Sequence, residues 1–370
     1  MGQHIERVAG IDLGDTHCSV CIIDASSGEV LERSEVRTRV KALTSFFGVR
    51  ERLRVALEVG THSPWVSRLL EEAGHEVIVA NARSVRLIYG GKRKSDRLDA
   101  EKLARLARVD VRLLAPVQHR SERAQADLAL LRSRDALVRS RTLLISSVRG
   151  LVKSFGARLP KCDADVFHRR APEHLPAELL PAHQPLLLAI ESLTKQILAF
   201  ERSIAGLCQT SYPETALFRQ VYGVAEITAL SYLLTLEDPA RFANSRQVGA
   251  FLGLAAGRRQ SGEHDPRCRI SKDGDEDLRR LLVQCAHVIL GPKGRDSDLR
   301  RHGLRIMRPG DKVSKRKAVV AVARKLAVLL HSLWISGEVY QPLRNSRTQN
   351  QSPPAQRPAA ETTIAMTAAQ

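Results

Sequence analysis

The sequence predicts an α/β domain followed by a mainly helical remainder, and three observations lead to this prediction. Residues 7–38 contain three strand-like runs separated by short turns. Two further strand patterns, at 54–60 and 76–80, alternate with helical segments. From residue 118 onward the apolar residues recur at helical spacing. Three strands, a helix, a strand, a helix and a strand, followed by helices, is the order of an RNase H-like domain with a mixed sheet.

Local signals delimit the elements of this first domain. A turn composition at 25–29 separates the second and third strands, and Gly74 and the pair Gly90-Gly91 each stop a helix. The expected strands cover 7–14, 17–24, 30–38, 54–60 and 76–80, and the expected helices cover 41–53, 63–73, 82–89 and 96–108.

Four acidic residues occupy positions that this topology should bring together. Asp12 ends the first strand, and Glu58 ends the strand that is expected to pair with it. Asp96 and Asp99 are three residues apart at the start of a helix, so they share one helix face. A basic run at 92–94 precedes them. Four such carboxylates can hold two Mg²⁺ ions about 4 Å apart, with Mn²⁺ as a substitute, as in phosphoryl-transfer sites on nucleic acid.

Each of these acids also has a purely structural interpretation. The macrodipole favours Asp in the first turn of a helix, Asp12 and Asp15 fit turn chemistry, and Glu58 fits a solvent-facing strand end. Because all four fall at matching ends of one topology, the metal site is the favoured interpretation.

The middle of the chain, 118–212, predicts a stalk of two long helices. Residues 118–155 form the first, and 160–185, rich in Pro, His and Ala, are expected to be a loop or hinge. Apolar residues from Leu186 to Leu207 alternate in steps of four and three, which predicts a coiled-coil seam in an antiparallel hairpin. The arginines of the first helix are either a rail for a phosphate backbone or a solvated face, and the sequence leaves both open.

The remaining part, 213–342, is expected to be a helical domain. Residues 214–236 are helical around Gly223, in an order that resembles a helix-hairpin-helix, although Ala225 replaces its second glycine. Further helices are expected at 245–254, 276–289 and 312–335; the last is basic and amphipathic, facing either phosphate or solvent. The tail, 343–370, has the composition of a disordered segment.

A polar, basic stretch at 255–272 carries the candidate nucleophile. Ser261 precedes Gly262, and four arginines surround the pair in the sequence. A serine hydroxyl held among guanidinium groups could attack a phosphodiester, with the arginines stabilising the transition-state charge. The alternative is an ordinary Ser-Gly turn whose basic neighbours bind DNA passively.

Composition supports a polyanionic partner. The 370 residues include 58 Lys and Arg against 40 Asp and Glu, a formal net charge of +18. Aromatic residues are only 4%, so contact through phosphates is expected to dominate over base stacking. We expect neither a signal peptide nor a membrane span. Cys18 and Cys21 lie in a predicted strand, where they would face opposite sides, so neither zinc nor a disulfide is expected. A cytoplasmic location, with reduced thiols, follows.

An alternative fold arises at the first strand. Residues 10–14, followed by a hairpin, also resemble the phosphate loop of actin-like sugar kinases. That fold needs a duplicated half with its own glycine-rich loop, and no such repeat follows residue 123. We therefore rank this interpretation below a nucleic-acid enzyme.

Several short motifs, each weak alone, form a specific set across the chain. They lie at 10–14, 56–60, 94–100, 223–242, 251–254, 261–262, 270–275, 278–282 and 317–340. As a set they resemble the DEDD-type insertion-sequence transposases of the IS110 group, which include the Piv pilin-gene invertase. Ser95 and Ala225 depart from that group's usual threonine and glycine.

The resemblance implies a site and a mechanism. Asp12, Glu58, Asp96 and Asp99 would form a RuvC-like metal site, and Ser261 would bond covalently to DNA. It also implies a structured guide, the bridge RNA, that pairs with donor and target DNA. A homodimer or homotetramer would let Ser261 of one subunit meet the acid site of another.

We therefore expect a site-specific DNA recombinase of the bacterial nucleoid that cuts and rejoins element ends and target. The expected parts are a metal domain at 1–117, the stalk at 118–212, a transposase domain at 213–342 and a tail. One alternative is a metal-dependent endonuclease of the Holliday-junction type without a covalent intermediate. Another is a non-catalytic nucleic-acid binder whose acids are structural.

Overall fold

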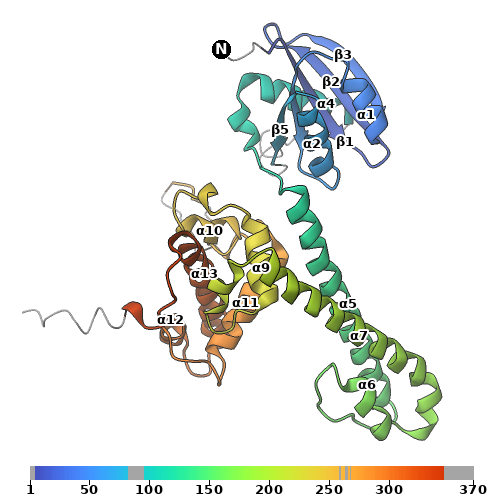
Figure 1. The fold of residues 1–370 in the computed structure, drawn as a ribbon, viewed down its shortest axis with the longest axis vertical. Coiled ribbons are helices and arrows are strands. Elements are labelled where there is room, and N and C mark those ends of the chain that lie inside the picture. Colours follow the sequence, from blue (N-terminus) through green and yellow to red (C-terminus); the bar gives the residue numbers. More distant parts are fainter. Residues whose placement is uncertain (1–4, 82–95, 258–259, 263–265, 267, 346–370) are drawn as a thin grey trace, which may run out of the picture. The chain divides into compact units, whose positions relative to one another are not determined.

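The structure, a computed structural model, describes residues 5–81, 96–257, 260–262, 266 and 268–345. The chain divides into two compact units, Met1–Ser121 and Glu122–Gln370 (Figure 1). The finer division expected at residues 117, 212 and 342 stays a prediction. The helix expected at 82–89 and the tail from residue 346 lie outside the described residues.

The first unit contains a five-stranded sheet in the order β3-β2-β1-β4-β5. Strands β1, β2 and β3 are antiparallel neighbours, whereas β4 runs parallel to β1, and β5 runs parallel to β4. This is the predicted RNase H-like arrangement, which is confirmed. Its elements are β1 (Arg7–Leu13), β2 (His17–Asp24), β3 (Val30–Arg37), α1 (Val40–Phe47), β4 (Arg54–Glu58), α2 (Ser63–Glu72), β5 (Glu76–Ala80), α4 (Asp96–Val109) and the 3₁₀ helix η1 (Val111–Leu114).

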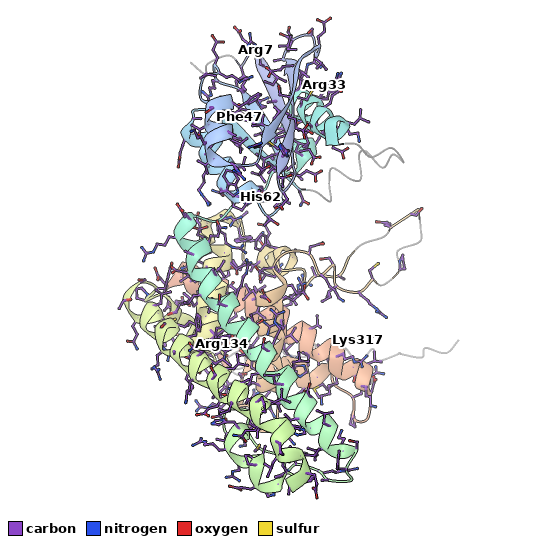
Figure 2. All side chains as sticks on the ribbon, turned by 90° about the vertical axis from the view of Figure 1, so that its right-hand side faces the viewer. Arg7, Arg33, Phe47, His62, Arg134 and Lys317 are labelled. Carbon is purple, nitrogen blue, oxygen red and sulfur yellow. The ribbon has the colours of Figure 1, made fainter. Side chains whose placement is uncertain are left out.

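Helices cover both faces of this sheet (Figure 1). Ile11 and Leu57 point to the face covered by α1 and α2, where Phe47 is fully buried (Figure 2). Ala56 and its neighbours point to the other face, which packs against Leu103 and Ala104 of α4. Successive strand residues alternate between these two cores, as a sheet buried on both sides requires.

The first helix is shorter than predicted, since it ends at Phe47 and not at residue 53. The buried His75 replaces the bonds that a longer helix would make. Its Nδ1 accepts from the amide of Leu53 at 3.1 Å, and its Nε2 lies 3.2 Å from the carbonyl oxygen of Phe47. Burial lowers the pKa of His75, which keeps the ring neutral and able to accept.

The second unit is helical within its described residues. Its elements are α5 (Glu122–Lys153), α6 (Phe167–Arg170), η2 (Pro172–His174), η3 (Ala177–Leu179), α7 (Leu180–Thr210), α8 (Thr215–Arg219), α9 (Glu226–Leu236), η4 (Pro239–Arg241), α10 (Arg246–Phe251), α11 (Glu276–Leu290), α12 (Asp298–Ile306) and α13 (Lys312–Ser336). Sequence analysis did not predict α12.

Helices α5 and α7 form the predicted antiparallel hairpin. Arg134 of α5 pairs with Glu201 of α7, and Arg141 of α5 donates to Thr194 of α7 at 3.2 Å. The contact residue number rises by seven on α5 while it falls by seven on α7, so the two helices run antiparallel. The predicted seam is right only in part. The predicted seam residues at 190, 197 and 204 are buried. At seam positions 186, 193 and 207 the next residue along the chain is buried instead, namely Leu187, Thr194 and Cys208. Leu151 of α5 and Phe155, two residues after its end, are more than half exposed.

The segment expected as a loop, 160–185, is a small folded tip. It contains α6, η2 and η3, and Phe167 and Leu175 pack against Val148 and Val152 of α5. Helix α7 begins at Leu180, with Pro185 inside it. The prolines suggested a break, but these apolar contacts compensate for the backbone hydrogen bond that Pro185 cannot donate.

Helix α13 passes through the main core of the second unit. Val322, Leu326 and Leu330 are fully buried against α9 and α11. By length and composition alone it would also cross a membrane, a test that core helices pass too. It is the one such helix among the described residues, and its burial accounts for its apolar character.

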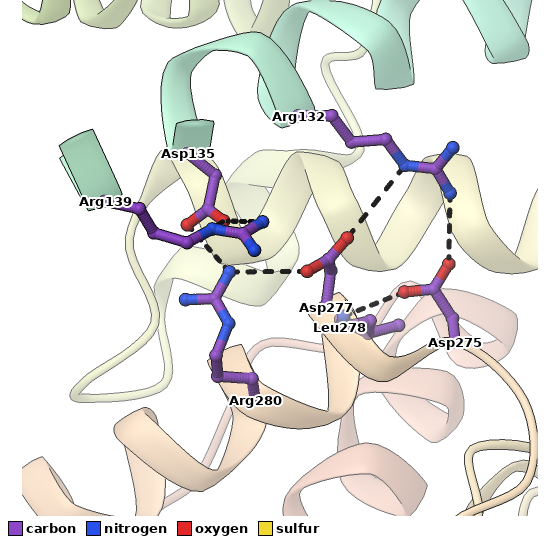
Figure 3. Close-up of polar contacts among 7 residues, drawn as sticks. All are labelled: Arg132, Asp135, Arg139, Asp275, Asp277, Leu278 and Arg280. Carbon is purple, nitrogen blue, oxygen red and sulfur yellow. Dashed lines mark hydrogen bonds and ion pairs between the residues drawn. The ribbon is translucent and has the colours of Figure 1, made fainter. Parts of the chain in front are cut away.

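An ion-pair cluster ties α5 to the start of α11 (Figure 3). Asp135, whose side chain is 15% exposed, binds Arg139 at 2.6 Å and Arg280 at 2.7 Å. Asp275 caps α11 by accepting from the amide of Leu278 at 2.9 Å. Arg132 lies 3.7 Å from the Asp275 carboxylate. Since α11 directly follows the polar stretch that contains Ser261, the cluster fixes one end of that stretch.

We predict that Asp135→Asn lowers the free energy of unfolding by about 2 kcal/mol, because two guanidinium groups lose a nearly buried charged acceptor. Urea denaturation measures the change. Glu191→Gln breaks an exposed ion pair with Lys195 on α7 and is expected to change stability very little. Equal effects of the two substitutions would show that the cluster does not stabilise the unit.

Candidate active site

Two of the four predicted acids lie at neighbouring strand ends. Strands β1 and β4 are parallel, with Gly10 opposite Ala56 and Ile11 opposite Leu57. The next residue is Asp12 in β1 and Glu58 in β4. Because the two strands are parallel neighbours, the two acids lie near the carboxyl ends of adjacent strands, at the same end of the sheet. Both are half-buried.

Strand alternation places both acids on the face that α4 covers. A Cβ atom at Gly10 would lie 1.9 Å from the carbonyl oxygen of Ala100, so the backbone of α4 rests directly on β1. Ala56 packs in the same layer. Because side chains two residues apart share a face, Asp12 and Glu58 also point to the side of α4. Only glycine permits this contact, since any Cβ would collide with the helix backbone.

The other two predicted acids begin α4. Asp99 is adjacent to Ala100, the residue over Gly10, and Asp96 is the first residue of the helix. The Asp99 carboxylate is half-buried and accepts from Lys102 Nζ at 2.7 Å. The side chain of Asp96 lies outside the described residues. On the same helix Leu98 is 43% exposed, whereas Leu103 and Leu106 are buried.

Polar contacts fix α4 on the sheet beyond its first turn. Arg33 of β3 binds Glu101 at 2.6 Å, and Arg105 binds it at 2.8 Å. Hydrogen bonds from Arg33 and then Arg105 lower the pKa of Glu101. Arg108 donates to the carbonyl oxygens of Ala25, at 3.0 Å, and Ser26, at 2.6 Å, in the β2–β3 turn. These contacts set the axis of the helix, and hence the position of its acidic first turn.

A histidine that sequence analysis missed joins the loops that follow the two strand-end acids. His62 Nε2 lies 3.1 Å from Asp15 Oδ1, and Trp65 Nε1 donates to His62 Nδ1 at 3.1 Å (His62 is labelled in Figure 2). Since Nδ1 accepts, the proton of the neutral ring is on Nε2, which donates to Asp15. Asp15 follows Asp12 by three residues and His62 follows Glu58 by four, so this bond links the loops that follow the two strands.

The donor set suits a hard divalent ion. Asp12, Glu58 and Asp99 offer carboxylate oxygens, which Mg²⁺ and Mn²⁺ prefer. Within the described residues, three or more His, Cys, Asp or Glu side chains do not come together closely enough to hold a metal ion. The role of these acids as metal ligands stays a prediction. Cys18 and Cys21 belong to the cores on opposite faces of the sheet.

Ser261 lies in the segment 255–271 of the second unit, called the serine ribbon here, whose two ends pair antiparallel. At the base of this serine ribbon Ala256 forms a bridge with Ile270, and the Gly257 amide donates to the Arg269 carbonyl oxygen at 2.9 Å. Ser261 is exposed. Gly262 has a φ of +58°, a conformation that favours glycine, and a Cβ there would meet no atom within 4 Å.

One arginine closes the base of the serine ribbon. Arg279 Nη1 donates to the carbonyl oxygens of Leu252, at 3.1 Å, and Asp273, at 2.8 Å. Gly253 and Gly274 both have positive φ and touch backbone across this closure. Arg279 of α11 therefore ties together the two backbone segments, at Leu252 and Asp273, that flank the serine ribbon.

The helix, turn and helix expected around Gly223 are present as α8, a turn and α9. Gly223 has a φ of +91°, and Ala225 is extended at the start of α9 without a side-chain cap. Arg219 pairs with Glu226 across the turn at 2.6 Å. Contact of this hairpin with DNA stays a prediction.

Two family models match the chain. One, described as a transposase of the DEDD IS110 type, matches residues 9–156, and the other, described as transposase IS116/IS110/IS902 family, matches residues 215–324. The first covers β1, β4 and α4 with all four predicted acids, and the second covers the serine ribbon.

Curated relatives match over most of their length. The transposase for insertion sequence element IS1328 of Yersinia enterocolitica is 31% identical, over 76% of this chain and 83% of the relative. The transposase for element IS1111A of Coxiella burnetii is 26% identical, over 90% and 91% respectively. A probable family 20 transposase of Pseudomonas aeruginosa is 28% identical, over 92% of this chain and all of the relative.

Two solved structures of Thermus thermophilus RuvC also match part of the chain. One covers 28% of this chain and 95% of RuvC, at 22% identity and a TM-score of 0.21. The other, RuvC in complex with Holliday junction substrate, covers 29% and 98%, at 21% identity and a TM-score of 0.22.

We predict that Gly10→Ala destabilises the first unit by at least about 2 kcal/mol, because the added methyl group meets helix backbone that cannot move aside locally. Thermal unfolding followed by circular dichroism measures the loss. Gly150→Ala is the matched control, since it adds the same methyl group to α5 where nothing lies within 4 Å. An unchanged melting temperature for Gly10→Ala would mean that α4 does not rest on β1.

Proposed function

The chain belongs to the IS110 family of insertion-sequence transposases, and from this premise we propose that it is a site-specific recombinase that moves its own element. As a DNA transposase it cuts and rejoins phosphodiester bonds. The observation that carries the proposal is the placement of Asp12 and Glu58 at adjacent strand ends, on the face covered by the helix that begins with Asp96 and Asp99.

We assign the metal ligands to these four acids. Asp12, Glu58, Asp96 and Asp99 would hold Mg²⁺, or Mn²⁺ in its place, and two ions are expected. Bound ions would supply Lewis-acid stabilisation of charge at the scissile phosphate. Lys102, which pairs with Asp99 at 2.7 Å, would hold that carboxylate in place. The Asp15–His62 bond would keep the strand ends at a fixed separation.

We assign the nucleophile to Ser261. Its oxygen would form a bond to phosphorus as the bond from phosphorus to one deoxyribose oxygen breaks; the serine proton would pass to solvent, and solvent would protonate the departing deoxyribose oxygen. The free hydroxyl of an incoming strand would later attack the phosphoserine and release Ser261. Its exposure, and an adjacent glycine that leaves open space, support this role. Arg269 at the ribbon base would add positive charge near the phosphate.

The partners follow from charge and family. The chain carries a net +18 and few aromatic residues, which suits contact with nucleic-acid backbones. We propose that DNA at the element ends and at the target is selected by pairing with a guide RNA, in the bacterial cytoplasm. Proteins of RNA-guided systems read shape and backbone and leave the sequence to pairing.

Self-association is the remaining part of the proposal. The α5–α7 hairpin exposes Leu143, Leu151, Phe155 and Leu188, each more than half exposed. Such residues on a helical hairpin favour a homodimer or homotetramer. Assembly would allow Ser261 of one copy to serve the acids of another.

We predict that Asp12→Ala and Ser261→Ala each abolish strand exchange on a supplied element and target, while binding to nucleic acid is retained. Loss of a ligand charge or of the nucleophilic oxygen removes chemistry and leaves the basic surface intact. Exchange is scored by amplification of the new junctions, and binding by gel shift. Glu35→Ala, at an exposed acid of β3, and Ser203→Ala, at an exposed serine of α7, are the controls.

Trapping separates this mechanism from hydrolysis. Labelled DNA that stays attached to denatured wild-type protein, and is released in Ser261→Ala, is the expected result. Cleavage with no attached label would identify a metal-dependent endonuclease instead. Full exchange by Ser261→Ala would remove that serine from the mechanism.

A further inference from the structure

A broad groove lies beside the serine ribbon within the second unit. It has a volume of about 2110 Å³. Its lining includes Gly257 and Arg269 of the ribbon base together with residues of α12 and α13. Residues 339–342, 344 and 345 also line it. The sequence analysis did not predict this groove, because it did not predict α12, which contributes to the lining.

The groove is strongly and asymmetrically charged. Ten Arg or Lys side chains line it, and Asp298 is the one acidic residue among its lining residues. Arg305 of α12 and Lys317 and Lys325 of α13 are exposed and have no carboxylate at ion-pair distance among the described residues (Lys317 is labelled in Figure 2). Cations left unpaired along one groove attract a polyanion.

A histidine in the groove reports this excess of positive charge. His302 of α12 lies in the lining, and its pKa is lowered, first by burial and then by the charges of Lys325 and Arg305. The two cations therefore face the groove closely enough to disfavour a further positive charge.

The floor between these cations is apolar. Leu304 of α12 and Val320, Val328 and Leu329 of α13 line it, and Leu304 is 44% exposed. A DNA duplex presents phosphates but hides the faces of its bases. A single strand presents both, so its bases can lie on an apolar floor while its phosphates reach the cations beside it.

We propose that this groove binds an unpaired strand of DNA, with phosphates on Arg305, Lys317 and Lys325 and bases over Leu304. The choice of DNA rests on the proposed function, because Gly257 and Arg269, at the base of the segment that carries Ser261, line the groove. A strand opened for exchange would thus lie along the serine ribbon. Duplex DNA and guide RNA are the competing occupants.

Binding of a labelled 12-nucleotide DNA strand tests the proposal. The full chain carries Asp12→Ala throughout, so that no cleavage occurs. The groove variant Arg305→Gln/Lys317→Gln/Lys325→Gln is expected to bind at least tenfold more weakly. Its slope of log affinity against log salt should fall by about 2, since each phosphate contact on a single strand contributes about 0.7.

A matched control removes three exposed cations elsewhere in the same unit. Lys153→Gln/Arg158→Gln/Lys161→Gln changes the net charge equally at the end of the α5–α7 hairpin, and its affinity is expected to stay within twofold. Leu304→Asn keeps the charge, lies at a partly exposed position, and is expected to weaken single-strand binding about fivefold while leaving duplex binding unchanged.

Three results would overturn the proposal. In the first, the groove variant keeps wild-type affinity for the single strand. In the second, the groove variant loses as much affinity for duplex DNA as for the single strand and Leu304→Asn has no effect; this result would assign the groove to duplex DNA. An RNA of the same sequence that binds tenfold more tightly than the DNA would assign it to RNA. Binding is measured without chemistry. Absence of a covalent adduct at Ser261 would therefore refute the proposed function and leave the groove assignment standing.

Discussion

The first unit depends on one close contact, that between the backbone of α4 and the glycine of β1. Gly10 allows the carbonyl of Ala100 and the amide of Ala104 to approach the strand where any side chain would collide. This contact sets which turn of α4 lies over the strand ends. The helix therefore brings its acidic first turn toward the edge where Asp12 and Glu58 end their strands. Contacts of Arg108 and Glu101 with the β2–β3 hairpin fix the other half of the helix.

The second unit follows a similar principle, in which the segment that carries the candidate nucleophile is tied down at both ends. Arg279 and two positive-φ glycines close the serine ribbon, and the cluster around Asp135 holds the start of α11 against α5. Ser261 itself is exposed beyond that base. The acids and the serine thus belong to different units of the chain, each held by its own packing. A reaction that uses both must bring two units, of one copy or of two, onto the same DNA.

Short-range patterns predicted much of this fold. The sheet order, β5 and the start of α4 at Asp96 follow from alternation, glycine stops and capping, which are local. The predicted end of α1 was wrong because His75, far along the chain, accepts the hydrogen bond from the amide of Leu53, a residue that the prediction placed in the helix. The prediction of a loop at 160–185 was wrong because Pro185 lies inside a helix that tertiary packing stabilises. His62 and the groove beside α12 were missed because each depends on residues distant in sequence, and no short motif marks them.

The central claim is that three separate segments meet around divalent ions, and iron-directed cleavage of the chain tests it most directly. Fe²⁺ replaces Mg²⁺ at carboxylate sites and, with ascorbate and peroxide, cuts nearby backbone. The account predicts cuts near residues 12, 58 and 96–99 together, all suppressed by excess Mg²⁺ and absent in Asp12→Ala. Cuts confined to one of these segments, or spread without preference along the chain, would contradict a shared metal site.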